Sequence, residues 1–93
     1  MQIKLGEKTY ETGKLTGEAL WESLEFEETV KAEKVMLNQL NMMAEQVVKL
    51  YKNQFTVEDI KKGLESHEVW ATLNNQCFGV GYKLVEKIET KNE

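Results

Sequence analysis

The chain has 93 residues with 41% hydrophobic and 30% charged side chains, and its formal net charge at pH 7 is −4. This length and balance predict a single globular domain spanning residues 1–93 rather than a disordered chain. Every basic residue apart from His67 is a lysine. Because proteins use arginine for most contacts with phosphates and guanine edges, the composition and the acidic charge argue against a nucleic-acid partner.

The apolar pattern also argues against a membrane partner. No apolar run approaches the roughly 18 residues that a membrane span needs, and the N-terminus lacks the basic, apolar and small-residue regions of a signal peptide. Cys77 is the single cysteine, so it has no partner for an internal disulfide. That usage fits a reducing cytoplasm, and we expect the protein there.

Residues 1–12 are predicted to form a β-hairpin or an extended arm. Ile3 and Leu5 alternate with polar residues, which is the period of a half-buried strand. Gly6 and the residue after it fit a two-residue turn of type II′, which would place Ile3 opposite Tyr10. A lone hairpin is marginal in water, so its apolar face should pack on helices.

The first helix is expected over residues 16–28, with Thr16 as its cap. Leu20, Trp21 and Leu24 are expected to face the core, with Trp21 as an anchor. The other side is acidic, with Glu18, Glu22, Glu25, Glu27 and Glu28. That side is either a solvated face or a surface that attracts a basic partner and repels like copies.

A long helical pattern covers residues 32–53. Its apolar stripe, with steps of four and three residues, consists of Met36, Leu40, Met43, Val47 and Leu50. Further apolar residues widen the stripe, so the helix is either central in a bundle or partly faces another chain. We predict partner contacts for Met42, Met43 and Tyr51, with core packing as the alternative, since methionine suits both tasks.

A short helix over residues 56–63 follows and is expected to fix the angle between its larger neighbours. Thr56 and Asp59 have the spacing of a capping box, and Phe55 and Ile60 have that of a hydrophobic staple. Gly63 is expected to end the helix by adopting a positive φ.

The last helix is expected over residues 66–90, with Ser66 as its cap. Its apolar stripe consists of Trp70, Leu73, Cys77, Val80, Leu84 and Ile88. The fold class is therefore mainly α, a small bundle of about four helices with an N-terminal hairpin or arm.

The sequence lacks a constellation for catalysis, cofactor binding or metal binding. His67 and Cys77 are the only histidine and cysteine, whereas a structural zinc site takes about four ligands. Cys77 lies in an apolar stripe and is expected to be a buried, inert thiol. We therefore expect a non-enzymatic protein without cofactors.

The stretch Val47-Val48-Lys49-Leu50-Tyr51-Lys52-Asn53-Gln54-Phe55-Thr56-Val57-Glu58-Asp59, followed by a Gly-Leu pair, resembles the tail assembly chaperones of long-tailed, siphovirus-type bacteriophages. The likeness covers residues 33–74 and, more loosely, the opening hairpin. The chain departs from the family pattern at Lys52, where the family often has glycine, and at Lys61-Lys62, where it is usually more acidic. Residues 78–81 have no counterpart in that pattern.

The resemblance implies a chaperone that acts in the host cytoplasm and is absent from the mature virion. Its partners would be the tape measure protein, which it would keep soluble, and the tail tube protein, whose assembly it would assist. Homo-oligomers are also expected. Two alternatives remain, namely a small helical adaptor or regulator that dimerises through its long helix, and an acidic inhibitor of a nucleic-acid enzyme.

Overall fold

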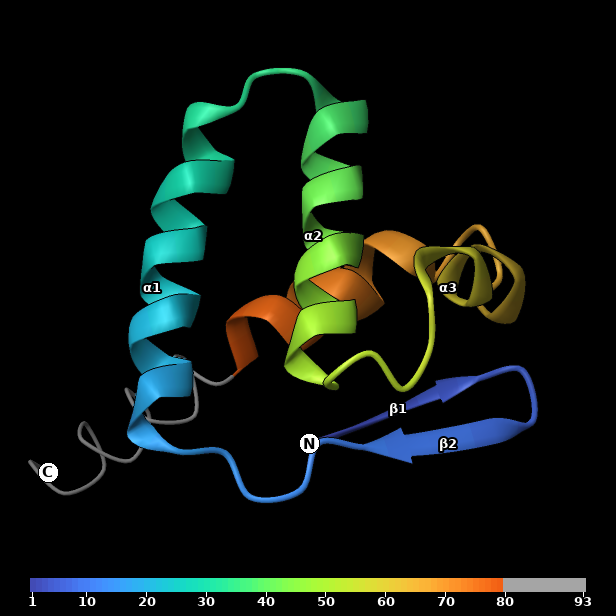
Figure 1. The fold of residues 1–93 in the computed structure, drawn as a ribbon. Helices are drawn as coiled ribbons and strands as arrows, with labels where there is room; N and C mark the ends of the chain where they lie inside the picture. The colour runs from blue at the N-terminus through green and yellow to red at the C-terminus, as the bar shows by residue number, and fades with distance from the viewer. Residues whose placement is uncertain (80–93) are drawn as a thin grey trace, which may run out of the picture.

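The computed structural model describes residues 1–79 and confirms a mainly helical fold with an N-terminal hairpin. Its elements, in chain order, are β1 (Gln2–Leu5), β2 (Lys8–Glu11), α1 (Gly17–Ala32), α2 (Met36–Leu50) and α3 (Val57–Gly63), followed by a fourth helix over residues 69–79 (Figure 1).

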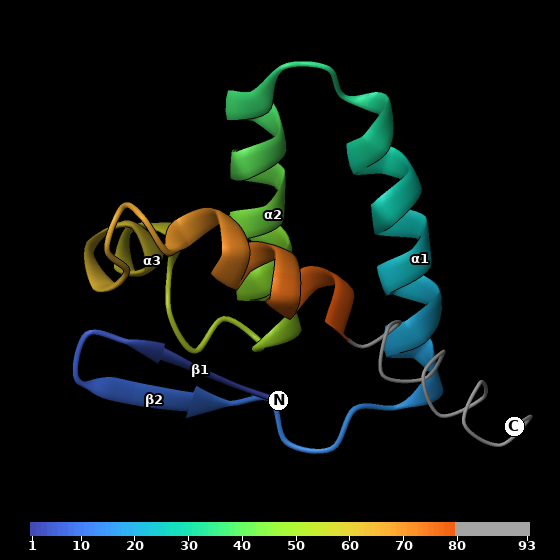
Figure 2. The same cartoon turned by 180° about the vertical axis from the view of Figure 1, so that it is seen from behind.

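The helices α1 and α2 lie side by side and antiparallel, joined by a short loop at the end of the molecule farthest from the β-hairpin (Figure 1). The fourth helix crosses α2 on one side and leads from α3 toward α1 (Figure 2). The hairpin lies under α3 and the C-terminal end of α2. The fourth helix therefore ties together elements that are distant in sequence.

The β-hairpin has the register that the sequence predicts. Ile3 pairs with Tyr10 and Leu5 pairs with Lys8 in an antiparallel ladder. Gly6 has a φ of 65°, which its turn position requires and which glycine adopts without steric cost. Ile3 and Leu5 are buried against the helices, so the hairpin gains the packing that an isolated one lacks.

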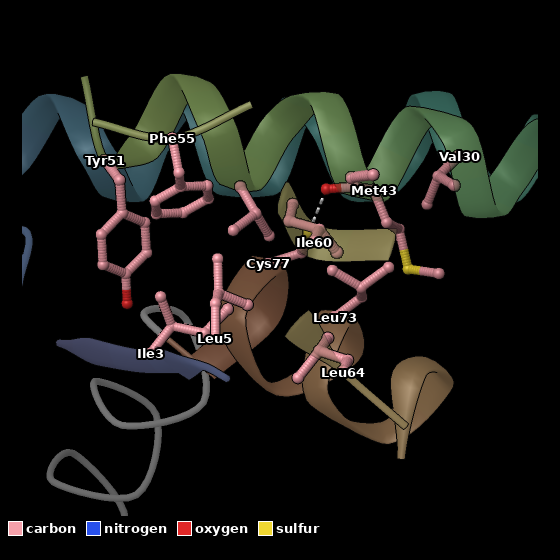
Figure 3. Close-up of a cluster of buried hydrophobic side chains, with 12 residues drawn as sticks. Ile3, Leu5, Val30, Met43, Tyr51, Phe55, Ile60, Leu64, Leu73 and Cys77 are labelled. Atoms are coloured by element: carbon pink, nitrogen blue, oxygen red, sulfur yellow. Dashed lines mark hydrogen bonds between the residues drawn. The ribbon is translucent and has the colours of Figure 1, made fainter. Parts of the chain in front are cut away.

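The core lies where α2, α3, the hairpin and the fourth helix meet (Figure 3). Its buried apolar residues are Ile3, Leu5, Val30, Met43, Ala44, Val47, Tyr51, Phe55, Ile60, Leu64, Leu73 and Cys77. The Ser23 hydroxyl donates to the Cys77 carbonyl at 2.9 Å, and the Cys77 thiol donates to the Met43 carbonyl at 3.4 Å. These bonds connect the fourth helix to α1 and α2.

A second chain of hydrogen bonds connects α2 to β1 through the fourth helix. The Tyr51 hydroxyl donates to Oε1 of Gln76 at 2.6 Å, and Nε2 of Gln76 donates to the Gln2 carbonyl at 2.8 Å. Burial raises the pKa of Tyr51 to about 12. The Tyr51 phenol therefore stays neutral. Its hydrogen bond to Gln76 satisfies the only polar atom of a fully buried side chain.

The boundary between the first two helices differs from the prediction. α1 extends to Ala32 rather than to residue 28, and α2 begins at Met36 rather than at residue 32, so α1 has 16 residues and α2 has 15. α1 continues because Val30 still faces the core. Nε2 of Gln39 then donates to the carbonyls of Val30 at 3.3 Å and Glu33 at 2.7 Å, which satisfies acceptors at the helix end.

The C-terminal end of α2 is a Schellman motif, three residues earlier than predicted. The N–H of Asn53 donates to the Val48 carbonyl and the N–H of Lys52 to the Lys49 carbonyl, both at 3.0 Å. Lys52 and Asn53 have left-handed φ angles of 54° and 61°. Lys52 therefore occupies the position where helices commonly end with glycine.

Replacing Lys52 with glycine is expected to raise the free energy of unfolding by about 1 kcal/mol, because glycine adopts this φ without the clash of a Cβ atom. Urea unfolding followed by circular dichroism measures the change. Lys49→Gly is the matched control, since Lys49 is inside α2 and glycine there should cost about 1 kcal/mol. A loss of stability in both variants would contradict this account of the helix end.

The short helix α3 confirms the predicted capping box and corrects the role of Gly63. The Thr56 hydroxyl accepts from the Asp59 N–H at 3.2 Å, and the Asp59 carboxylate accepts from the Thr56 N–H at 2.9 Å. The bond from the Thr56 backbone holds the pKa of Asp59 below its usual value. Gly63 is the last helical residue and does not have a positive φ. Its carbonyl accepts from the Gly6 N–H at 2.9 Å, where α3 approaches β1.

The fourth helix begins at residue 69 rather than 66, after a turn over residues 66–68. Glu68, not Ser66, makes the local cap, because its carboxylate accepts from the Glu65 N–H at 3.0 Å. Thr16 holds the N-cap position of α1 as predicted, but its side chain makes no capping hydrogen bond. The part of the predicted 66–90 helix beyond residue 79 lies outside the described residues.

Candidate partner-binding surface

The most exposed apolar segment of the described chain is the junction between α1 and α2. Val35, Met36 and Leu37 follow one another and are 53%, 68% and 64% exposed. We call these three residues the loop cluster. Three consecutive apolar side chains point in different directions around a helix, so the core is unable to bury all of them. Exposed apolar residues that adjoin one another are typical of interaction surfaces.

Local hydrogen bonds hold the loop cluster in place. The Glu33 carboxylate accepts from the Val35 N–H at 3.0 Å, and this bond lowers the pKa of Glu33. Gln39, one turn into α2, fixes the other side of the loop through its bonds to the carbonyls of Val30 and Glu33. The exposed side chains are thus carried by an ordered turn.

A groove with a volume of about 220 Å³ lies between α1, α2 and the fourth helix. We call it the three-helix groove; its lining residues are Glu27, Val30, Lys31, Gln39, Met43, Trp70, Asn74 and Phe78. Trp70 is 43% exposed, and Met43 is 2% exposed. Gln39 of α2 lines this groove and also donates a hydrogen bond to the Glu33 carbonyl in the loop that carries the cluster. The groove and the loop cluster therefore lie next to each other.

Two of the three predicted contact residues are core residues. Met43 and Tyr51 are 2% and 0% exposed, because the fourth helix packs over this side of α2. Met43 supplies the closed side of the groove rather than an accessible surface, and the prediction of surface contact for these two is wrong. Met42 is half-buried against the core cluster, and partner contact there stays a prediction.

The five predicted structural residues lie together around α3. Phe55 and Ile60 are 3% and 2% exposed, which places both members of the predicted staple in the core. Thr56 and Asp59 form the cap, and Gly63 contacts β1. These residues position the hairpin and the start of the fourth helix rather than a binding surface.

The apolar stripes predict core positions for Trp21 and Trp70, and this prediction is wrong for both. Trp21 is 68% exposed, and Leu24 beside it on α1 is 50% exposed, while Trp70 lines the groove. The position of Trp21 relative to Val30 in the sequence could have indicated that Trp21 is exposed. It is nine residues from Val30, about two and a half helical turns, so the two side chains lie on opposite faces of one helix.

The chemical groups that the sequence singled out are in ordinary environments. Cys77 is buried, and burial raises its pKa to about 12, so the thiolate needed for nucleophilic attack is disfavoured. The His67 ring is exposed and lies 3.4 Å from a Glu65 carboxylate oxygen. Among residues 1–79, no cluster of three metal-ligating side chains is present. No helix in this described part is long and apolar enough to cross a membrane.

Exposed apolar residues that adjoin one another on a small helical domain are typical of a surface that binds other proteins. The chain matches the family model described as phage tail chaperone protein over residues 1–93, and it belongs to that family. The match confirms the resemblance that the segment around Tyr51 and Phe55 indicated. No curated protein and no solved structure matches the chain.

Proposed function

We propose that this phage tail chaperone binds the tape measure protein of a long-tailed phage and assists assembly of the tail tube, without catalysis. The three-helix groove and the loop cluster carry the proposal, because they leave apolar surface exposed on a member of this family. A long helical protein that aggregates when unassembled offers apolar side chains of the kind that such a surface accommodates.

The physical mechanism is reversible apolar contact. The groove is lined in part by apolar side chains of α2 and the fourth helix, and Met36 of the loop cluster is an adaptable side chain that repacks against different partners. Such contacts delay aggregation and are released when tube subunits cover the tape measure protein. We place this activity in the host cytoplasm, with the chaperone absent from the finished particle.

Co-expression with the tape measure protein tests the proposal. The soluble fraction of the tape measure protein should rise when this chain is present, and Leu37→Glu should largely abolish the gain, because it places a charge in the loop cluster. Asn75→Glu is the matched control, since Asn75 is exposed on the fourth helix and does not line the groove. It adds the same charge and should retain the parent's activity.

Two results would contradict the proposal. One is an equal soluble fraction of tape measure protein with and without the chain. The other is an equal loss in the Leu37→Glu and Asn75→Glu variants, which would indicate a general effect of charge. Light scattering on the purified chain tests the alternative adaptor function. A dimer formed through α2 that does not bind the tape measure protein would support that alternative.

A further inference from the structure

The helix α1 carries large apolar side chains on a face that the fold leaves uncovered. Its inner face is packed, with Ser23 and Val30 buried. Trp21 and Leu24 lie on the other side and are 68% and 50% exposed. An indole with that exposure leaves a large apolar area in water, and tryptophan is the residue type most enriched at the energetic centres of protein interfaces.

The same helix holds the charge excess of the molecule. α1 contains five glutamates and one lysine, so its net charge equals the −4 of the whole chain, and the remaining residues balance. Within residues 1–79, Glu27 pairs with Lys31 at 2.9 Å, and it is the only glutamate of α1 in an ion pair. The exposed glutamates without an ion pair there are Glu18, Glu22, Glu25 and Glu28.

The apolar and acidic side chains form one surface. Trp21 is three residues from Glu18 and Leu24 and four from Glu25, and Leu24 is four from Glu28, so these are neighbours along the helix. We call these five residues the acidic face of α1. The carboxylates surround the indole, and a second copy of this chain docking here would bring like charges together. Charge complementarity therefore favours a cationic partner.

We propose that the acidic face of α1 binds an amphipathic helix rich in lysine or arginine from a partner protein. The apolar stripe of that helix packs on Trp21 and Leu24, and its flanking cations pair with Glu18, Glu25 and Glu28. This surface lies on the side of α1 opposite Val30, which lines the three-helix groove. The inference goes beyond the proposed function, because it concerns a second surface with different chemistry.

The test uses the full chain with Trp70→Phe, which leaves Trp21 as the only indole. The probe is a synthetic peptide of about 18 residues with leucine on one helical face and lysine on the other. Its binding should shift the Trp21 fluorescence to shorter wavelength, and added sodium chloride should weaken binding through screening. A matched peptide with every lysine replaced by glutamate should produce no shift.

Charge-reversal variants locate the binding. Glu25→Lys combined with Glu28→Lys should raise the Kd of the lysine peptide at least about tenfold, because it converts two attractions into repulsions. Glu45→Lys combined with Glu65→Lys is the control, since both glutamates are exposed and lie outside α1. This control changes the net charge by the same amount and should leave the Kd close to that of the parent.

Several outcomes would overturn the inference. Equal shifts with the lysine and glutamate peptides would mean that apolar contact alone drives binding. Equal Kd increases in the two charge-reversal variants would assign binding to the overall charge. A Trp21 emission already typical of a buried indole in the free protein would show that a second copy, or another part of the chain, covers this face. None of these results depends on the tape measure protein, so the proposed function is tested separately.

Discussion

Phe55→Ala is expected to lower the free energy of unfolding by about 3–5 kcal/mol, the range for removing a buried aromatic side chain. Phe55 is 3% exposed, and its ring centroid lies 4.9 Å from that of Tyr10 and 5.2 Å from that of Tyr51. One side chain therefore joins β2, the end of α2 and the entry to α3. Removing the ring would leave a cavity between these three elements, and a closely packed core collapses into such a cavity only in part.

The loss is large relative to the whole stability of such a domain, which is on the order of 5–15 kcal/mol. The midpoint of urea unfolding should fall clearly, and the hairpin should lose protection from hydrogen exchange together with α3. Thr56→Ala is the neighbouring control, since removing its cap should cost only about 1 kcal/mol. A Phe55→Ala melting temperature equal to the parent's would show that this stretch does not organise the fold.

Local interactions explain what the sequence predicted well. The capping box of α3 depends on residues three apart, and the hairpin register depends on a two-residue turn at Gly6, so a short window contains the whole signal. The buried thiol of Cys77 followed from its place in an apolar stripe. Family membership was likewise visible in a continuous segment around Phe55.

Long-range packing explains what the sequence did not predict. Met43 and Tyr51 belong to an apolar stripe, and a stripe is unable to show whether the fourth helix or another chain covers it. Trp21 was also predicted wrongly. Its hydrophobicity alone favours a core position, whereas its place on the face of α1 opposite Val30 keeps it out of the core. The exposure of Val35 depended on a helix boundary that Gln39 fixes through bonds nine and six residues away.

Gly63 has the structural role that the sequence predicted, but for a different physical reason. The sequence suggested a positive φ at the end of a helix, but Gly63 is the last residue of α3 and does not have such an angle. The actual constraint comes from β1, which lies almost sixty positions earlier in the chain. A Cβ atom on Gly63 would lie 2.7 Å from Cβ and 2.9 Å from Cα of Leu5.

Gly63→Ala is therefore expected to lower the free energy of unfolding by about 1–3 kcal/mol, the usual cost of overpacking. The clash involves the backbone of Leu5, so a change of rotamer does not relieve it, and α3 must move away from β1. That movement would lengthen the 2.9 Å hydrogen bond from the Gly6 N–H to the Gly63 carbonyl. The amide proton of Gly6 should accordingly exchange faster with solvent than in the parent.

Gly17→Ala provides the matched control for this last substitution. A Cβ atom on Gly17 would lie 3.9 Å from the Trp21 ring, an ordinary contact, and Gly17 is the first residue of α1. Alanine is a better helix former than glycine, so this variant should be as stable as the parent or more stable. If Gly63→Ala also matched the parent in urea unfolding and in Gly6 exchange, the close approach of α3 to β1 would not be a constraint on this position. A loss confined to Gly63→Ala would instead identify that approach as the reason that glycine stands there.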